Sequence, residues 1–178
     1  VDASTIGLQG NAAATLTLQG VSDGATVLLE GAGTAAPGNI GNVAVNIDGA
    51  TTSSPAENLT VNVNNAGTDA DDGTTDSPEE GITTGTVDTD DVKNVTINVA
   101  DGDATLGALT TSTKLETLTV TGNEDVDLTN TTALGAGAEA GLTGIDASGV
   151  SGAFDATIAG DLESEFTFTG AAGKDTLT

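Results

Sequence analysis

The amino-acid sequence predicts an all-β protein, built as a right-handed parallel β-solenoid in a single segment spanning residues 1–178. Three observations lead to this prediction: apolar and polar residues alternate, the clearest strands resemble one another, and aromatic residues are nearly absent. An antiparallel β-sandwich is the alternative. A sandwich core about 10 Å thick usually needs large side chains. This chain has three Phe and no Trp, Tyr or Met, which favours a narrow solenoid filled by Val, Ile, Leu and Ala.

The apolar alternation is most regular in three similar segments: NVAVNI from Asn42, NLTVNV from Asn58 and NVTINV from Asn94. A period of two places the aliphatic residues on one face of a strand and the polar residues on the other. Clusters of Gly, Asn, Asp and Ser follow such runs, as turns require. No segment predicts a helix. Shorter runs of the same kind lie at residues 16–18, 26–29, 118–120 and 166–168.

The spacing of the three similar segments predicts how the strands stack. They start 16 and 36 residues apart, which indicates a repeat of about 16 residues with an insertion of about 20. We therefore expect an acidic insertion loop at about 68–91. In a stack, equivalent residues form ladders with side-chain amides hydrogen-bonded along the axis. The expected ladders are Asn42 with Asn58 and Asn94, and Asn46 with Asn62 and Asn98.

A second similarity relates VDAS at Val1 to IDAS at Ile145, each followed by a short strand. Asp2 and Asp146 within these segments are predicted to accept hydrogen bonds from nearby amides rather than to bind metal.

The charge of the chain excludes several classes of function. Three lysines, no arginine and 27 acidic residues give a net charge of −24, which argues against binding nucleic acid, since that requires positive charge. No apolar stretch approaches the roughly 20 residues of a membrane helix, so we expect no membrane insertion. Divalent cations are the natural counter-charge. The chain begins on Val1 without a methionine, and we expect it to be a piece of a longer protein.

The last nine residues, GAAGKDTLT from Gly170, nearly match the calcium-binding nonapeptide G-G-x-G-x-D-x-U-x. Glycines allow the turn to aim its carbonyl groups at an ion, and the aspartate supplies a carboxylate. Calcium takes six to eight oxygens, so ligands must come from successive turns and one copy is half a site. The candidate calcium ligands in this turn are Gly170, Ala172, Gly173 and Asp175.

The acidic insertion contains a second group of candidate calcium ligands, but its spacing is not that of an EF-hand loop. A solvated loop and a calcium site both remain open for it. Further carboxylates at predicted strand ends could each donate one ligand without identifying a site. The candidate ligands in the insertion are Asp69, Asp71, Asp72 and Asp76, and the strand-end carboxylates are Asp101, Asp103, Glu124, Asp125 and Asp127.

Three stretches carry a resemblance to a known family: KLETLTVTGNEDVDLT, LTGIDASGVSGAF and the terminal nonapeptide. Together they resemble the segment that precedes the calcium repeats in RTX-type bacterial surface-layer proteins and related large RTX adhesins. The resemblance is clearest from Thr117 to Thr178, and Ala171 departs from the nonapeptide pattern. It implies type I secretion, folding outside the cell in calcium, a calcium β-roll turn at the end of the solenoid, and self-association into a surface lattice. Contacts with neighbouring domains, and with cell-surface glycans through other domains, are also implied.

Two other functions compete with a structural role. An enzyme is disfavoured, because without His, Tyr, Arg or Cys the supply of bases and nucleophiles shrinks to carboxylates, hydroxyls and lysines. An adhesive or ice-binding face is the stronger alternative, because T-x-T runs could align as a flat threonine surface. Threonine is also an ordinary solvent-facing strand residue. The runs lie at Thr15–Thr17, Thr117–Thr121 and Thr167–Thr169.

Overall fold

A computed structural model describes residues 5–9, 15–31, 39–51, 53–65, 82–89, 91–100, 104–107, 109–110, 114–128, 141–158 and 165–178. Within these residues the protein is all-β, as predicted, and contains no helix. Every pairing between its named strands is parallel. The alternative of an antiparallel sandwich is therefore wrong for the described part of the chain.

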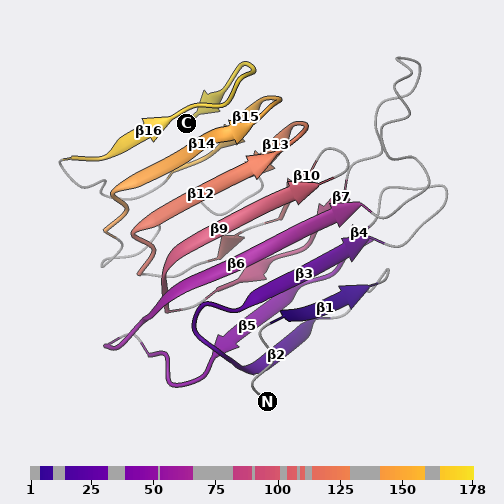
Figure 1. Cartoon of the computed structure of the whole chain (residues 1–178), viewed down its shortest axis with the longest axis vertical. Coiled ribbons are helices and arrows are strands. Elements are labelled where there is room, and N and C mark those ends of the chain that lie inside the picture. Colours follow the sequence, from indigo (N-terminus) through magenta and orange to yellow (C-terminus); the bar gives the residue numbers. More distant parts are fainter. Residues whose placement is uncertain are drawn as a thin grey trace.

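The strands form three sheets, and Figure 1 shows the largest of them as a row of arrows running from the N-terminal to the C-terminal end. Sheet A contains, in spatial order, β1 (Thr5–Gln9), β3 (Thr26–Gly31), β6 (Ala56–Asn65), β9 (Val92–Ala100), β12 (Thr117–Gly122), β14 (Gly144–Val150) and β16 (Thr167–Thr169). Sheet B contains β2 (Leu16–Val21), β5 (Val43–Ile47), β8 (Val87–Asp88) and β11 (Leu109–Thr110). Sheet C contains β4 (Asn39–Ile40), β7 (Ile82–Thr84), β10 (Ala104–Leu106), β13 (Val126–Leu128), β15 (Phe154–Ala156) and β17 (Thr176–Leu177).

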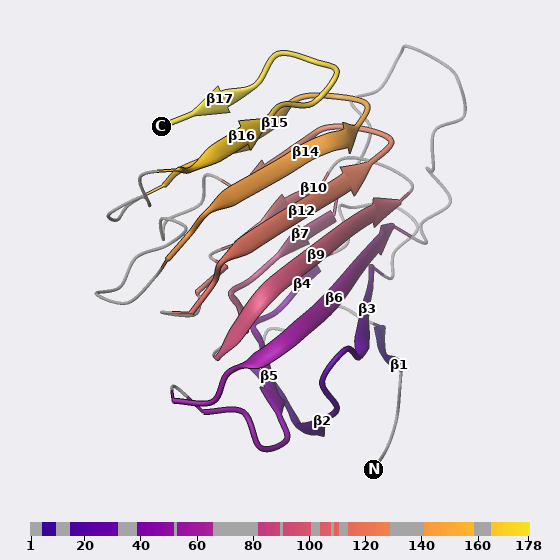
Figure 2. The same ribbon diagram turned by 60° about the vertical axis from the view of Figure 1, so that its left-hand side comes forward.

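The chain visits the sheets in a repeating order. From β3 to β12 each pass runs from sheet A to sheet C to sheet B and back to sheet A, and from β12 onward the described strands alternate between sheets A and C. Each strand pairs with the equivalent strand of the next pass, so the passes lie one above another (Figure 2). Contacts therefore form mainly between neighbouring passes.

The register corrects the predicted repeat of about 16 residues. Asn58 pairs with Asn94, and Asn62 with Asn98, as the ladder prediction requires. Asn42 and Asn46 do not join these ladders, because the segment from Val43 belongs to sheet B and pairs with β2 and β8. The 16-residue spacing thus runs within one pass, from one sheet to another.

Part of the segment predicted as an acidic insertion loop, at about 68–91, forms strands. Residues 66–81 and Asp90 lie outside the described part of the chain. Ile82–Thr84 and Val87–Asp88, which were predicted to belong to the loop, form strands β7 and β8. These short strands escaped prediction because two or three residues are too few to show a period.

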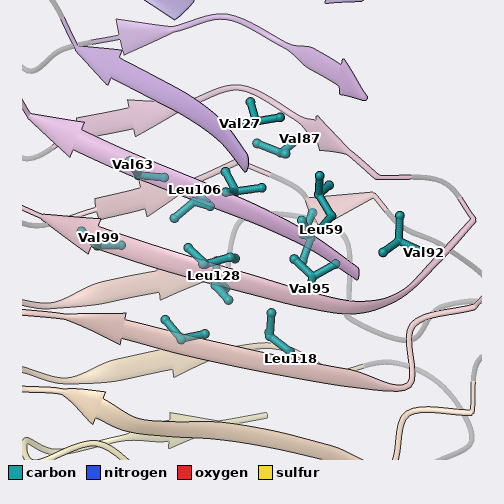
Figure 3. Packing of buried hydrophobic residues seen from close by; sticks show 14 of the residues in the cluster. Val27, Leu59, Val63, Val87, Val92, Val95, Val99, Leu106, Leu118 and Leu128 are labelled. Atoms are coloured by element: carbon teal, nitrogen blue, oxygen red, sulfur yellow. The ribbon is translucent and has the colours of Figure 1, made fainter. Parts of the chain in front are cut away.

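The core lies between the three sheets and is filled almost entirely by aliphatic side chains (Figure 3). Sheet A contributes columns in which inward residues repeat from pass to pass, such as Leu59, Val95 and Leu118. Phe154 is fully buried and its ring stacks on Phe168, with centroids 6.2 Å apart. Two buried threonines, Thr84 and Thr89, place hydroxyl groups in this core without a hydrogen-bond partner.

Candidate functional site

The terminal nonapeptide forms the turn between β16 and β17, and the carboxylate of Asp175 closes it. Its Oδ2 accepts a hydrogen bond from the backbone N–H of Ala171 at 3.0 Å, and its Oδ1 accepts one from Phe154 N–H at 3.1 Å. Phe154 lies on β15, the strand that pairs with β17. The carboxylate therefore joins two successive passes, and both of its oxygens already accept backbone amides.

The glycines of this turn are required by close contact. A Cβ on Gly170 would meet Oδ2 of Asp175, and a Cβ on Gly173 would meet the backbone of Gly152. The N–H of Ala172 donates to a carbonyl of the preceding pass at 3.0 Å, and that of Gly173 does so at 2.8 Å. The four predicted ligands thus share one turn. With one carboxylate committed to two amides, and a need for six to eight oxygens, the turn does not fit a calcium site by itself.

Side-chain oxygens also accept backbone amides of an adjacent pass at other turns of the fold. Oδ1 of Asp125 accepts a hydrogen bond from Ala153 N–H at 2.6 Å, and Oδ1 of Asn42 accepts one from Thr86 N–H at 2.9 Å. In each case a side-chain oxygen of one pass binds an amide of the next pass. Asp125, considered above as a ligand donor, therefore joins adjacent passes.

Asp23 makes two hydrogen bonds of this kind to one adjacent pass. Its two carboxylate oxygens accept hydrogen bonds from the N–H groups of Asn58 at 2.9 Å and Glu57 at 3.1 Å. These bonds, that from Asn58 most of all, hold the pKa of Asp23 below its ordinary value, because they favour the ionised carboxylate.

Asp146 behaves as predicted, accepting local hydrogen bonds from the hydroxyl of Ser148 at 2.6 Å and from its N–H at 2.9 Å. The hydroxyl bond is the main reason that the pKa of Asp146 is lowered. Its predicted counterpart Asp2 lies outside the described residues, as do Asp101 and Asp103 and the four insertion ligands Asp69, Asp71, Asp72 and Asp76.

The outer face of sheet C brings together two carboxylates whose pairing was not predicted. Asp127 on β13 pairs in register with Asp155 on β15, between Thr105 and Thr176 on the adjacent strands. We call these four residues the oxygen column. Oδ1 of Asp155 is buried and has no hydrogen-bond partner among the described residues. Because adjacent strands lie about 4.8 Å apart, like charges at these two positions repel each other, and a cation between them would relieve this repulsion.

The outer face of sheet A carries a regular array of uncharged polar side chains, which we call the Asn/Thr face. Three rows cross strands β6, β9 and β12, and the alternate residues point into the core. The rows are Asn58, Asn94 and Thr117; Thr60, Thr96 and Thr119; and Asn62, Asn98 and Thr121.

Hydrogen bonds along the stack hold the two outer rows of this face. Asn98 Nδ2 donates to Asn62 Oδ1 at 2.8 Å, and Thr121 Oγ1 donates to Asn98 Oδ1 at 2.8 Å. In the other row, Thr117 Oγ1 donates to Asn94 Oδ1 at 2.7 Å. The amide ladder was predicted for the asparagines, but its continuation through the threonines of β12 was not.

The three T-x-T runs do not form one face. Thr117–Thr121 and Thr167–Thr169 both belong to sheet A, but β14 lies between their strands and places Gly144 and Asp146 in the corresponding rows. Thr17 lies on β2 in sheet B. The regular threonine pattern is thus interrupted between neighbouring passes.

Neither a family model, nor a curated protein, nor a solved structure matches this chain. Among the residues that the structure describes, no three acidic, histidine or cysteine side chains gather closely enough to hold a metal ion. No described helix could cross a membrane.

Proposed function

We propose that this chain is a segment of a calcium-dependent extracellular surface layer, in which it serves as a structural β-solenoid. The observation that carries the proposal is the oxygen column of sheet C, where Asp155, with one buried carboxylate oxygen, pairs in register with Asp127. In a chain of net charge −24, such a pair calls for a cation.

The solenoid is supported by the repeating order of sheets A, C and B and by parallel pairing of equivalent strands. Each pass is then one coil. Right-handed coils are proposed because parallel strands of one sheet are joined by right-handed connections in nearly all proteins. The whole chain is proposed to be one domain, since the core cluster includes residues of every sheet.

Calcium suits the oxygen column because it prefers carboxylate and other oxygen ligands in flexible arrangements. Asp127 and Asp155 would hold the ion from two neighbouring strands, and water would supply the remaining oxygens that calcium requires. A bound ion supplies positive charge between two passes, so it stabilises the stacked state over the unfolded chain. The terminal turn with Asp175 would contribute only together with ligands from another turn.

The proposal places the protein outside the cell, where calcium is abundant, with other copies or neighbouring domains as its partners. A structural role is favoured over catalysis because the chain contains no histidine, cysteine, tyrosine or arginine. An adhesive or ice-binding segment is the second candidate, favoured by the Asn/Thr face. The interruption of the threonine rows at β14 weighs against it.

Thermal unfolding with calcium, magnesium or a chelator tests the calcium proposal. The melting temperature should rise with calcium far more than with equal magnesium, because the flexible site suits the larger ion. Asp155→Asn should raise the melting temperature in chelator and abolish the calcium response, because it removes both the repulsion and a ligand. Asp48→Asn, at an exposed position in a turn after β5, makes the same change in net charge and should retain the response. Equal responses to calcium and magnesium would refute specific binding, and an Asp155→Asn variant that keeps the calcium response would refute this site.

A further inference from the structure

The Asn/Thr face is an uncharged part of the described surface. Its nine side chains are asparagine or threonine, in a chain with 27 acidic residues. The nearest charges lie at the edges of the face. Glu57, Lys93 and Glu116 precede the first row, and Lys93 is paired with Glu57 at 2.7 Å. Asp146 on β14 pairs in register with Thr119, at the end of the middle row. Copies of a chain with charge −24 repel one another over most orientations, and contact through nine uncharged side chains brings no charged group of this face against another.

The face is also rigid before it meets a partner. Each outer row is fixed by side-chain hydrogen bonds that run from one pass to the next. Two of the three strands beneath it, β6 and β9, are the longest of the described strands. Because these side chains have already lost rotamer freedom, little further conformational entropy is lost when they are covered.

The middle row supplies unused hydrogen-bonding groups. The hydroxyls of Thr60, Thr96 and Thr119 have no hydrogen-bond partner among the described residues, whereas Thr117 and Thr121 on either side are bonded. A hydroxyl both donates and accepts. A row of hydroxyls spaced by the strand separation of about 4.8 Å can therefore pair with another row of the same spacing.

We propose that the Asn/Thr face of sheet A is the surface by which two copies of this chain associate face to face. A second copy has the same strand spacing, the same lack of charge and hydroxyls that both donate and accept, so every row finds its match. A two-fold axis brings the same patch of both partners together. This inference rests on the proposed surface-layer function and names the contact that builds it.

Two variants that introduce a negative or a positive charge at the centre of the Asn/Thr face test the proposal. Thr96 lies in the middle row of the central strand, so Thr96→Glu and Thr96→Lys each place two like charges together in a symmetric pair. Sedimentation velocity of the unmodified chain should show the average mass rising toward about twice the monomer with concentration. It should rise further with salt, which screens the repulsion of the copies beyond about 10 Å at 0.1 M.

Each Thr96 variant alone should remain monomeric, and an equal mixture of the two should regain association, because the opposite charges then face each other. Asn46→Glu on the outer face of sheet B is the matched control and should associate like the unmodified chain. Circular dichroism checks that all variants remain folded.

A chain that stays monomeric at high concentration and salt overturns the inference, as do Thr96 variants that associate normally or a mixture that does not recover. Monomers that show thermal hysteresis would assign the face to ice instead. The calcium response of the melting temperature is measured separately, so its loss with association intact refutes the calcium proposal alone.

Discussion

The outer faces of sheets A and C share one construction principle and carry opposite chemistry. Both consist of parallel strands in register, so a residue on one strand lies beside its equivalent on the next. On sheet A the repeated residue is asparagine, and Asn98 donates to Asn62 at 2.8 Å. On sheet C it is aspartate, and Asp127 faces Asp155 without a hydrogen bond to Oδ1 of Asp155.

This difference shows that in-register stacking repeats the same side-chain interaction between each pair of strands, whether that interaction is attractive or repulsive. An amide both donates and accepts, so an asparagine row satisfies itself at every step. A carboxylate only accepts, so an aspartate row repels itself and depends on a cation or on backbone N–H groups. Asp23 and Asp175 use backbone N–H groups at the turns, whereas Oδ1 of Asp155 in the oxygen column has no hydrogen-bond partner among the described residues.

The largest expected change in the free energy of unfolding comes from replacing an asparagine of the sheet A ladder by aspartate, the residue that is repeated on sheet C. Asn98→Asp removes the donor to Asn62 and sets a carboxylate against its carbonyl oxygen. We expect the free energy of unfolding in urea to fall by about 2 kcal/mol, the cost of a half-buried acceptor left unpaired beside a charge.

Asn46→Asp is the matched control for that variant, because Asn46 occupies the same place in a similar sequence segment but is exposed on sheet B. Its effect should stay within about 0.5 kcal/mol, as for most surface substitutions. Equal losses in the two variants would contradict the assignment of the ladder to sheet A alone.

A smaller effect is expected where a carboxylate finds backbone donors. Asp23→Ala removes two hydrogen bonds to the next pass and should cost about 1 kcal/mol at neutral pH, since the group is exposed. The folded-state pKa of Asp23 is lowered, so its contribution is present above the ordinary aspartate pKa of about 3.9 and is lost as the pH falls through the lower folded value.

The free energies of unfolding of the unmodified chain and of Asp23→Ala, compared across this pH range, measure the contribution of Asp23. The other carboxylates titrate in both proteins and cancel in the difference. The gap in stability should be constant above about pH 5 and close as the pH falls. A gap that widens in acid would show that the lowered pKa has been assigned to the wrong group.

The smallest effect distinguishes two neighbouring threonines of the Asn/Thr face. Thr121→Val removes the hydroxyl that donates to Asn98 and should cost about 0.5–1 kcal/mol. Thr119→Val removes a hydroxyl with no partner among the described residues and should change stability by less than about 0.5 kcal/mol. Chemical denaturation of the monomers compares them, and the opposite order would contradict the hydrogen-bond pattern of the outer row.

Much of the fold could be predicted from the alternation of residues, but the sheet assignment could not. Val43–Ile47 and the strand from Leu59 share a pattern, and both were correctly expected as strands. Their similarity suggested that they stack, whereas they lie on different sheets of one pass. Alternation reports which side of a strand is buried, and it carries no information on which distant strand lies beside it.

The candidate site also contains some features that the sequence predicted and others that it did not. The nonapeptide placed Gly170, Gly173 and Asp175 in one turn, but it predicted the glycines for their backbone conformations and the carboxylate as a calcium ligand. In the structure the glycines are required by close contacts, and the carboxylate accepts backbone amides. The pairing of Asp127 with Asp155 could not be foreseen, because the two residues are separated by a connection whose length differs from those of its neighbours.

By itself the sequence determined the all-β class, the side of each long strand that faces the core, and the excess of negative charge. These properties depend on local period and composition, which are present in the unfolded chain. Only the tertiary structure decided which strands belong to each of the three sheets, the continuation of the Asn rows through Thr, and the pairing of Asp127 with Asp155. Those follow from the register between adjacent passes, which buried side chains select because a shift of one residue would turn the apolar face outward.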